Sequence, residues 1–143
     1  MMRAVLVRHA RAGDRAEWAG DDRLRPLDTK GHRQSMLIAA TLAELGVTRL
    51  VSSPYLRCVQ TLEPAAKCLG LEIEGRDELA EGGAAEDVLG LLDELAGSLP
   101  ALCTHGDVLE ALLGDRPCKK GSSWVVTVAG GRVRPERYLA PPA

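Results

Sequence analysis

The amino-acid sequence predicts an α/β fold, namely a three-layer α/β/α sandwich with a mostly parallel sheet and an antiparallel edge. Short continuous apolar runs, typical of strands buried on both faces, alternate with longer segments whose apolar residues recur at helical spacing. The pattern changes at the end of the chain, where two alternating stretches flank Gly130-Gly131 and indicate a β-hairpin. The length of 143 residues, without a repeat or an internal linker, predicts a single domain over residues 1–143.

The first elements follow from these patterns in order. Arg3 to Val7 is an apolar run that predicts a buried strand. Residues 10–30 contain glycines, a proline and scattered aspartates without a steady period, so we expect a long loop of the kind that often carries function. A helix is expected from His32 to Gly46, and its predicted apolar positions are Met36, Leu37, Ala40, Leu42 and Leu45.

The middle of the chain repeats this alternation. Leu50-Val51 predicts a second strand, after which Ser53 can cap a helix and Pro54 can occupy its first position. This helix should end near Leu69, and a short strand should follow at residues 71–73. After a glycine-containing loop at residues 75–84, the pattern predicts a helix at 86–96, a buried strand at 101–103 and a helix beginning near Val108.

Composition excludes several classes of protein. Lysine and arginine number 18 against 20 aspartates and glutamates, and this near balance argues against binding to a nucleic acid polymer. Hydrophobic residues make up 45% of the chain, which excludes a disordered protein, and the absence of phenylalanine predicts a core of leucine, valine, isoleucine and alanine. By size scaling, the folded chain should expose roughly 7,000 Å².

The cysteines and the apolar segments indicate the compartment. Cys58, Cys68, Cys103 and Cys118 form no C-x-x-C pair and have no histidine at zinc-finger spacing, so we expect reduced thiols. No apolar stretch approaches the ~20 residues of a membrane span. We therefore expect a cytoplasmic protein without a membrane partner, and the sequence leaves its oligomeric state open.

Candidate functional residues stand directly after the predicted strands, where ligands bind in open α/β sheets. Arg8 and His9 follow the first strand, Ser52-Ser53-Pro54 and then Arg57 follow the second, and His105 follows the strand at 101–103. Two histidines and two arginines converge only where an anion offsets their charge. This pattern predicts an anion site.

The common alternatives for phosphate chemistry fail on spacing. A cysteine-based phosphatase needs an arginine at a fixed short distance after its nucleophile, but the four corresponding positions hold Pro64, Glu74, Leu109 and Trp124. Phosphate-binding loops of the P-loop and dinucleotide types are absent, as is a serine nucleophile elbow. The third histidine, His32, is expected to be a solvated residue at a helix start. We therefore expect no metal site and no cofactor.

Three segments carry a resemblance to a known family. They are Leu6-Val7-Arg8-His9-Ala10, the stretch from Ser52-Ser53-Pro54 through Arg57 to Thr61, and Thr104-His105-Gly106. In this order they resemble the signature segments of the histidine phosphatase (phosphoglycerate mutase-like) superfamily. Arg25-Pro26-Leu27 followed by Gly31 is similar to its SixA-like phosphohistidine phosphatases and to phosphatase domains joined to Nudix hydrolases. Ala10 departs from the usual R-H-G, and the short length disfavours a phosphoglycerate mutase.

The resemblance implies a role for each matching residue. His9 would be the nucleophile and form a phosphohistidine that water later hydrolyses. Arg8 and Arg57 would clamp the phosphate oxygens with their planar guanidinium groups, and His105 would donate to the same oxygens in the transition state. Arg25 would be a fourth phosphate contact.

A general acid is needed only when the leaving group is poor. Glu81 stands where the acidic proton donor of the superfamily would lie in chain order, and Glu78 and Glu86 are its rivals. If Glu81 is in the site, phosphomonoesters are expected substrates; if it is not, a phosphoamidate such as phosphohistidine is favoured.

The sequence thus predicts a metal-independent phosphohydrolase that acts on a phosphorylated protein or small molecule through His9. The alternative is a catalytically silent phosphate-binding or regulatory module of the same fold. A third reading, from a different class, is a structural domain in which these residues form ion pairs.

Overall fold

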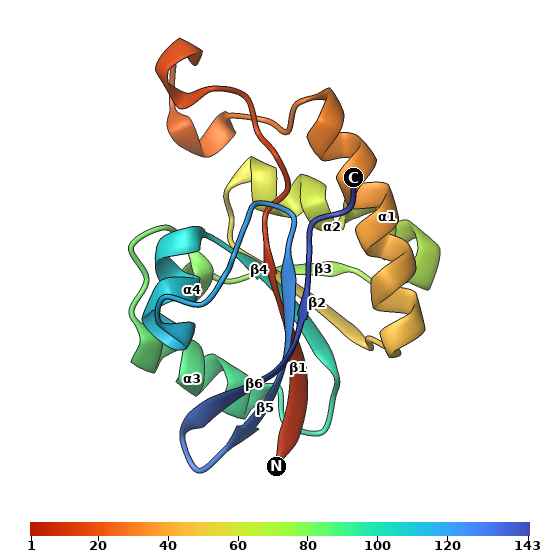
Figure 1. Ribbon diagram of the computed structural model, residues 1–143, viewed down its shortest axis with the longest axis vertical. Coiled ribbons are helices and arrows are strands. Elements are labelled where there is room, and N and C mark those ends of the chain that lie inside the picture. The colour runs from red at the N-terminus through yellow and green to blue at the C-terminus, as the bar shows by residue number, and fades with distance from the viewer.

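Six strands form one sheet in the order β3-β2-β4-β1-β5-β6 in the computed structural model, which describes residues 1–143 (Figure 1). Strands β1, β2, β3 and β4 are mutually parallel, whereas β5 is antiparallel to β1 and forms a hairpin with β6. The strands are β1 (Met2–Arg8), β2 (Arg49–Ser52), β3 (Ile73–Gly75), β4 (Pro100–Thr104), β5 (Ser123–Ala129) and β6 (Arg132–Leu139).

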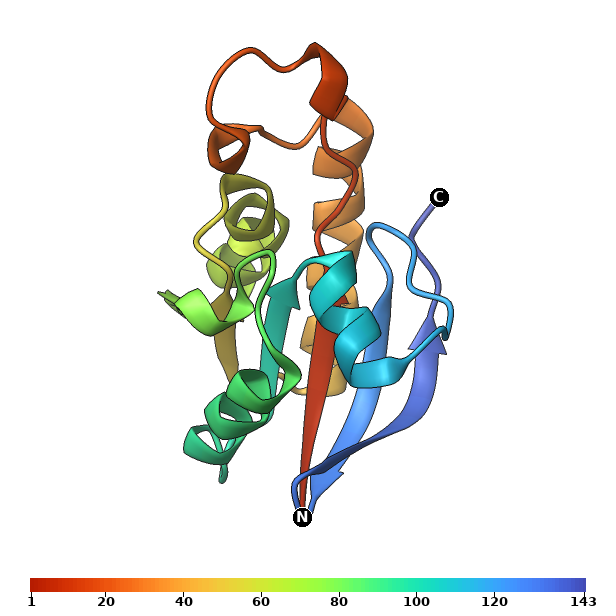
Figure 2. The ribbon, with the colours of Figure 1, turned by 90° about the vertical axis from the view of Figure 1, so that its left-hand side faces the viewer.

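Helices cover both faces of this sheet (Figures 1 and 2). The helices α1 (Thr29–Leu45) and α2 (Leu56–Leu69) pack together on one face, and α3 (Ala85–Glu94) and α4 (Gly106–Leu113) lie on the other. Short 3-10 turns occur at η1 (Arg15–Glu17), η2 (Asp22–Leu24) and η3 (Asp77–Leu79). The predicted three-layer α/β/α architecture with an antiparallel edge is therefore confirmed.

The core has one half on each face of the sheet. Successive residues of β1 alternate between the halves, so that Ala4 and Leu6 pack with α3 and α4, whereas Val5 and Val7 pack with α1 and α2. Each half contains 14 buried residues, and leucine, valine and alanine supply most of them, as the composition predicts. The total exposed surface of 7254 Å² agrees with the size scaling.

The first helix differs from the prediction at its start and on one face. It begins at Thr29, because the Asp28 side chain caps it by accepting a hydrogen bond from the Gly31 N–H at 2.8 Å. His32 consequently lies inside the helix, where it is exposed. Met36 and Leu37 are 66% and 50% exposed, since Ile38, Ala39 and Leu42 form the buried face. Ala40 is exposed as well, so three of the five apolar positions that indicated this helix lie outside the core.

The start of α2 also differs. This helix begins at Leu56 after Tyr55, so Ser53 does not cap it and Pro54 does not occupy its first position. The Ser53 hydroxyl instead lies within 2.8 Å of the His105 Nε2 atom. A tertiary contact thus replaces the local cap that the sequence suggested.

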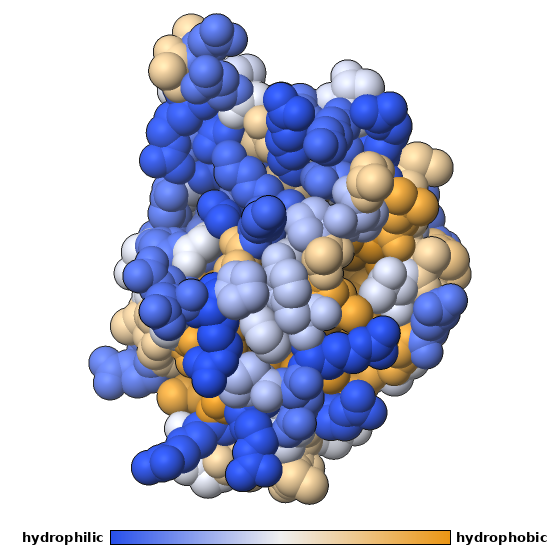
Figure 3. Space-filling view, in the orientation of Figure 1, coloured by the Kyte–Doolittle hydropathy of each residue, from blue (hydrophilic) through white to orange (hydrophobic).

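The long loop between β1 and α1 rises beyond the carboxyl ends of the parallel strands (Figure 1). Hydrophilic side chains cover this upper part of the molecule in the space-filling view (Figure 3). Gln60 of α2 fastens the loop to the body by accepting a hydrogen bond from the Leu27 N–H at 2.8 Å. None of the helices combines the length and the apolar character needed to cross a bilayer.

Candidate active site

The ends of three neighbouring strands bring the predicted residues together. Strands β2, β4 and β1 are adjacent and parallel, so the residues that follow them emerge at one edge of the sheet. The His9 N–H donates to the Thr104 carbonyl at 3.1 Å, and the Ser53 N–H donates to the Cys103 carbonyl at 2.9 Å. The rings of His9 and His105 consequently face each other edge to face, with 5.5 Å between their centroids.

His9 has the protonation state that a nucleophile needs. Its Nδ1 atom lies 2.9 Å from the Ala10 carbonyl oxygen, which can only accept, so Nδ1 carries the proton and Nε2 keeps a free lone pair. Burial and, to a smaller extent, the neighbouring Arg57, His105 and Arg8 together lower the pKa of His9 to about 3, against the opposing effect of the Ala10 hydrogen bond. The imidazole is therefore neutral at pH 7.

Arg8 lies beside His9, and one hydrogen bond to the backbone holds its guanidinium. Its Nη1 atom donates to the Cys118 carbonyl at 2.7 Å, and the group passes close to Gly106, the first residue of α4. The buried Nε atom of Arg8 has no hydrogen-bond partner. One donor of this arginine is thus left for a ligand.

Arg57 is fully buried and faces an acidic residue. Its terminal nitrogens donate to the Asp22 carbonyl at 2.8 Å and the Asp22 carboxylate at 3.1 Å, and its guanidinium lies 5.0 Å from the centre of the Tyr55 ring. Its Nε atom has no partner. Arg57 does not line the open cavity, because Asp22 engages its outer edge.

Asp22 also holds Arg25, the residue that the R-P-L segment suggested. The Arg25 Nε atom donates to the Asp22 carboxylate at 2.9 Å, and the Arg25 side chain is only 5% exposed. Burial works to raise the pKa of Asp22, but Arg25, Arg57 and Arg15 together hold it below its usual value. An anionic carboxylate therefore joins the arginines of the loop to Arg57 of the body, a feature that no motif in the sequence indicated.

Of the three candidate glutamates, only Glu81 lines the cavity. It forms an ion pair with Arg15 at 2.9 Å and lies 3.8 Å from Arg57, and its side chain is 34% exposed. Glu78 is instead paired with Arg76 at 2.6 Å. Glu86 lies in the first turn of α3, outside the cavity.

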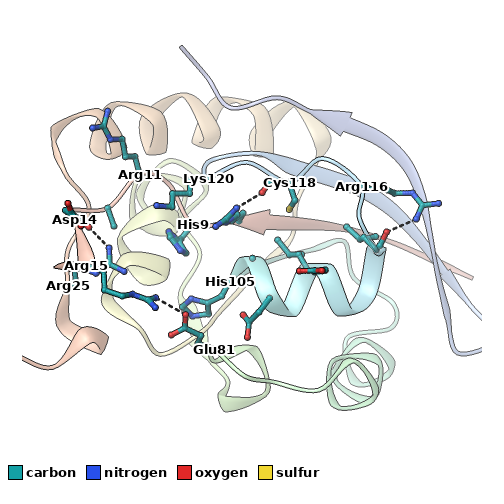
Figure 4. A pocket seen from close by; sticks show the side chains of 18 of the residues that line it. His9, Arg11, Asp14, Arg15, Arg25, Glu81, His105, Arg116, Cys118 and Lys120 are labelled. Atoms are coloured by element: carbon teal, nitrogen blue, oxygen red, sulfur yellow. Dashed lines mark hydrogen bonds and ion pairs between the residues drawn. The ribbon is translucent and has the colours of Figure 1, made fainter. Parts of the chain in front are cut away.

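The cavity around these residues has a volume of about 910 Å³ and lies between the loop after β1 and helix α4 (Figure 4). Arg8, His9, Arg25, Glu81 and His105 all line it. Four further basic residues of its wall were not among the predicted site residues, namely Arg11, Arg15, Arg116 and Lys120. Arg11 and Arg15 could have been predicted, because they follow His9 closely in the loop after the first strand.

Lys120 shows how positive this region is. Partial burial and the nearby charges of Arg8, Arg25, Arg15 and Arg57 lower its pKa. No group of three or more histidine, cysteine, aspartate or glutamate side chains in the chain is arranged to hold a metal ion. The positive charge of the cavity thus comes from arginine and lysine side chains.

Comparisons with known proteins agree with this geometry. The family model described as "Histidine phosphatase superfamily (branch 1)" matches residues 4–101. The 8-oxo-(d)GTP phosphatase of Mycolicibacterium smegmatis is 36% identical over 96% of this chain. The phosphohistidine phosphatase SixA of Escherichia coli K12 is 40% identical over 49% of the chain. A solved structure of the protein histidine phosphatase SixA complexed with tungstate superposes with a TM-score of 0.82 at 28% identity, covering 98% of this chain and 97% of that one.

The curated relatives are longer than this chain. The matching regions cover 48% of the mycobacterial phosphatase and 43% of E. coli SixA. The chain therefore spans about half the length of the curated relatives that it matches.

Proposed function

Because the chain belongs to the histidine phosphatase superfamily, in its SixA-like branch, we propose that it is a phosphatase that forms a phosphohistidine intermediate on His9. One observation carries the proposal. Three buried nitrogens without a hydrogen-bond partner belong to Arg8, Arg57 and His105, the residues around His9. Buried donors are almost always satisfied, so unpartnered ones point to an absent acceptor. A phosphoryl group offers three such oxygens.

The first chemical step forms one bond and breaks another. The lone pair of His9 Nε2 attacks phosphorus, and the bond from phosphorus to the leaving group breaks. Arg8 and His105, which line the cavity, donate to the non-bridging oxygens, where negative charge develops. Arg57, whose terminal nitrogens are held by Asp22, keeps its Nε atom for the same purpose. Glu81, in its protonated form, gives its proton to a leaving alkoxide.

The second step returns the site to its starting state. The Glu81 carboxylate accepts a proton from a water molecule as that water attacks the phosphohistidine. The P–N bond breaks, and its electron pair returns to Nε2, so inorganic phosphate leaves and Glu81 is again protonated. Arginine and histidine donors serve as the electrophilic clamp, and we therefore propose that turnover needs no metal ion.

Substrates of two kinds fit this mechanism. The relatives are named for a phosphohistidine protein and for an oxidised guanine nucleotide. The open, mostly polar cavity supports a phosphohistidine or a small phosphomonoester as the substrate of this chain. A panel of phosphohistidine peptides, mononucleotides and sugar phosphates would rank these classes.

The decisive experiment compares the wild-type protein with His9→Ala, using p-nitrophenyl phosphate. The wild type should release phosphate and, on rapid acid-free quenching, carry an acid-labile, base-stable phosphoryl label; His9→Ala should do neither. His32→Ala is the matched control, because His32 is exposed on α1 and does not line the cavity. Turnover by His9→Ala would contradict the nucleophile assignment.

The silent-module alternative gives a different result. It predicts that vanadate, which imitates a phosphoryl group in transfer, binds to a protein that turns over no member of the panel. The proposed phosphatase should instead be inhibited by vanadate and remain active in EDTA. Loss of activity in EDTA that a divalent ion restores would overturn the metal-independent mechanism.

A further inference from the structure

The surroundings of His105 constrain which of its ring nitrogens carries the proton. Nε2 lies 2.8 Å from the Ser53 hydroxyl oxygen, and Nδ1 is buried without a partner. His105 is also the residue at which α4 starts, but its side chain makes no capping hydrogen bond. The imidazole is therefore oriented by its tertiary contacts alone.

The Ser53 hydroxyl has one nitrogen or oxygen acceptor for its proton, His105 Nε2, because the Cys58 sulfur beside it is only a weak acceptor. Its oxygen accepts the Tyr55 N–H at 3.2 Å, and the side chain is fully buried, so water does not reach it. If Ser53 also accepted a proton from Nε2, its own buried O–H would lack a nitrogen or oxygen acceptor, which is costly. Donation from Ser53 to Nε2 satisfies both groups, and it leaves the proton of a neutral imidazole on Nδ1.

We propose that Ser53 is a positioning residue whose hydroxyl holds the proton of His105 on Nδ1, where it can be donated to the phosphoryl group in transfer. This inference rests on the proposed function, since the acceptor is the substrate phosphoryl oxygen. The inference also gives a role to the Ser53 hydroxyl, which the sequence suggested as a helix cap. Without Ser53, the neutral ring is free to place its proton on Nε2 and to turn a lone pair toward the negatively charged oxygens.

The backbone around Ser53 keeps the hydroxyl in place. Its N–H donates to the Cys103 carbonyl at 2.9 Å, and its carbonyl accepts the Ser52 hydroxyl at 2.8 Å. On the other side, the Tyr55 ring packs edge to face against the His105 ring at 4.6 Å. These contacts fix both members of the hydrogen bond.

Several titratable groups surround the His105 ring and bear on its pH dependence. Arg8 and His9 approach from the end of β1, and Arg57 and Cys58 approach from α2. The carboxylates of Glu81 and Asp107 line the same cavity. The Cys58 sulfur lies 3.6 Å from Nε2. Burial raises the pKa of Cys58, but Cys103, His105 and Ser53 lower it to about 6.

The test is the pH profile of Ser53→Ala with p-nitrophenyl phosphate. At about pH 7.5 we expect kcat to fall by roughly 10- to 100-fold, near the effect of losing one preorganised donor. The loss should shrink as the pH is lowered, because a doubly protonated imidazole carries the Nδ1 proton without help from Ser53. His9 remains able to react over this range, since its pKa is about 3.

Two variants serve as controls. Ser53→Thr keeps a hydroxyl and should restore the wild-type profile. Ser35→Ala removes a buried hydroxyl of α1 that donates to the His32 carbonyl, away from the cavity, and should leave the profile unchanged. A Ser53→Ala defect of equal size at every pH, or no defect, would overturn the inference.

A spectroscopic readout separates this inference from the proposed function. Long-range proton–nitrogen correlation spectra distinguish the two neutral tautomers of histidine, and the chain contains only three histidines to assign. Wild-type His105 should show the Nδ1–H form, and Ser53→Ala should gain the Nε2–H form. If His9→Ala retained turnover while His105 showed the Nδ1–H form, the mechanism would fail but the tautomer assignment would stand. An Nε2–H form in the wild type would refute the assignment itself.

Discussion

The surroundings of His9 meet two requirements at once, namely positive charge for phosphate binding and an unprotonated imidazole. A phosphate site requires positive charge, whereas a nucleophilic imidazole must not bind a proton. Burial lowers the pKa of His9, and the neighbouring Arg57, His105 and Arg8 act in the same direction. The charges that would attract the substrate therefore also keep the Nε2 lone pair free.

This lowered pKa predicts a specific acid sensitivity. Unfolded His9 binds a proton as the pH falls below 6.5, whereas the folded residue does so only near pH 3, so acid favours the unfolded chain in this window. Between pH 7.5 and 4.5, His9 should contribute a loss of about 2 to 3 kcal/mol in the free energy of unfolding. Urea titrations of His9→Asn should lack this contribution, whereas His32→Asn should behave as the wild type. Equal pH dependence in all three proteins would contradict the lowered pKa.

The role of Glu81 determines which leaving groups the enzyme can release. If it is the proton donor, Glu81→Gln should slow hydrolysis of alkyl phosphates by ~10²–10⁴-fold and p-nitrophenyl phosphate much less, because a nitrophenolate leaves without a proton. Glu78→Gln is the matched control, since Glu78 pairs with Arg76 outside the cavity. Initial rates on both substrates measure the difference. A small and equal effect would remove Glu81 from the chemistry and favour a phosphohistidine substrate.

At the scale of elements, the first residue of α4 lies so close to the Arg8 guanidinium that any side chain there would displace it. A Cβ atom at Gly106 would lie 2.8 Å from the central carbon of the Arg8 guanidinium. His105 directly precedes this glycine, so one junction between strand and helix positions both a histidine and an arginine of the site. The close packing of α4 on β1 thus sets the geometry of the phosphate clamp.

The variant Gly106→Ala tests this packing. The added methyl group should displace the Arg8 guanidinium and lower kcat/KM for p-nitrophenyl phosphate by roughly tenfold or more, as expected for a misplaced charged donor. Gly90→Ala in α3 is the control, because a Cβ there meets open space. It should leave activity intact and raise the free energy of unfolding by roughly 0.5 to 1 kcal/mol through helix propensity. Full activity of Gly106→Ala would show that Arg8 tolerates the displacement.

At the scale of the whole molecule, the sequence predicted those parts of the fold that depend on residues close together along the chain. Apolar runs such as Arg3 to Val7 and the Gly130-Gly131 turn predicted the strands and the hairpin, and the structure confirms them. The apolar positions Met36 and Leu37 indicated the helix but are exposed, because periodicity cannot tell which apolar stripe of α1 meets the sheet. The helix start after Ser53 was missed because a contact with a residue far along the chain replaced the cap.

The same limit applies to the site. Residues that follow strands could be gathered in advance, because parallel strands end at one edge. The Asp22 bridge between Arg25 and Arg57 could not, since it depends on how the long loop folds back over the sheet. Chain order already favoured Glu81 over Glu78 and Glu86, whereas the finding that Glu81 alone of the three lines the cavity required the structure. The catalytic roles of Arg25, Arg57 and Glu81 stay predictions.

The order of the strands predicts slow folding. Strand β1 pairs with β4 and β5, so its partners lie about a hundred residues away along the chain. Mixed α/β domains with such distant contacts fold more slowly than local helical folds, which need only microseconds to milliseconds. Stopped-flow refolding from urea, followed by the fluorescence of Trp18 and Trp124, should show a phase of milliseconds or longer. Refolding within the dead time would contradict the dependence on distant pairing.

The central position of β1 has a consequence for synthesis on the ribosome. Within this domain, Arg8 and His9 are made before every other strand, yet the strand that carries them has no partner until Pro100–Thr104 and Ser123–Ala129 emerge. A nascent chain that ends before β4 therefore has an open, unpaired first strand and no enclosed imidazole. The earliest-made part of the pocket is the last to be closed, so a reactive His9 should arise only when translation of the domain is nearly finished.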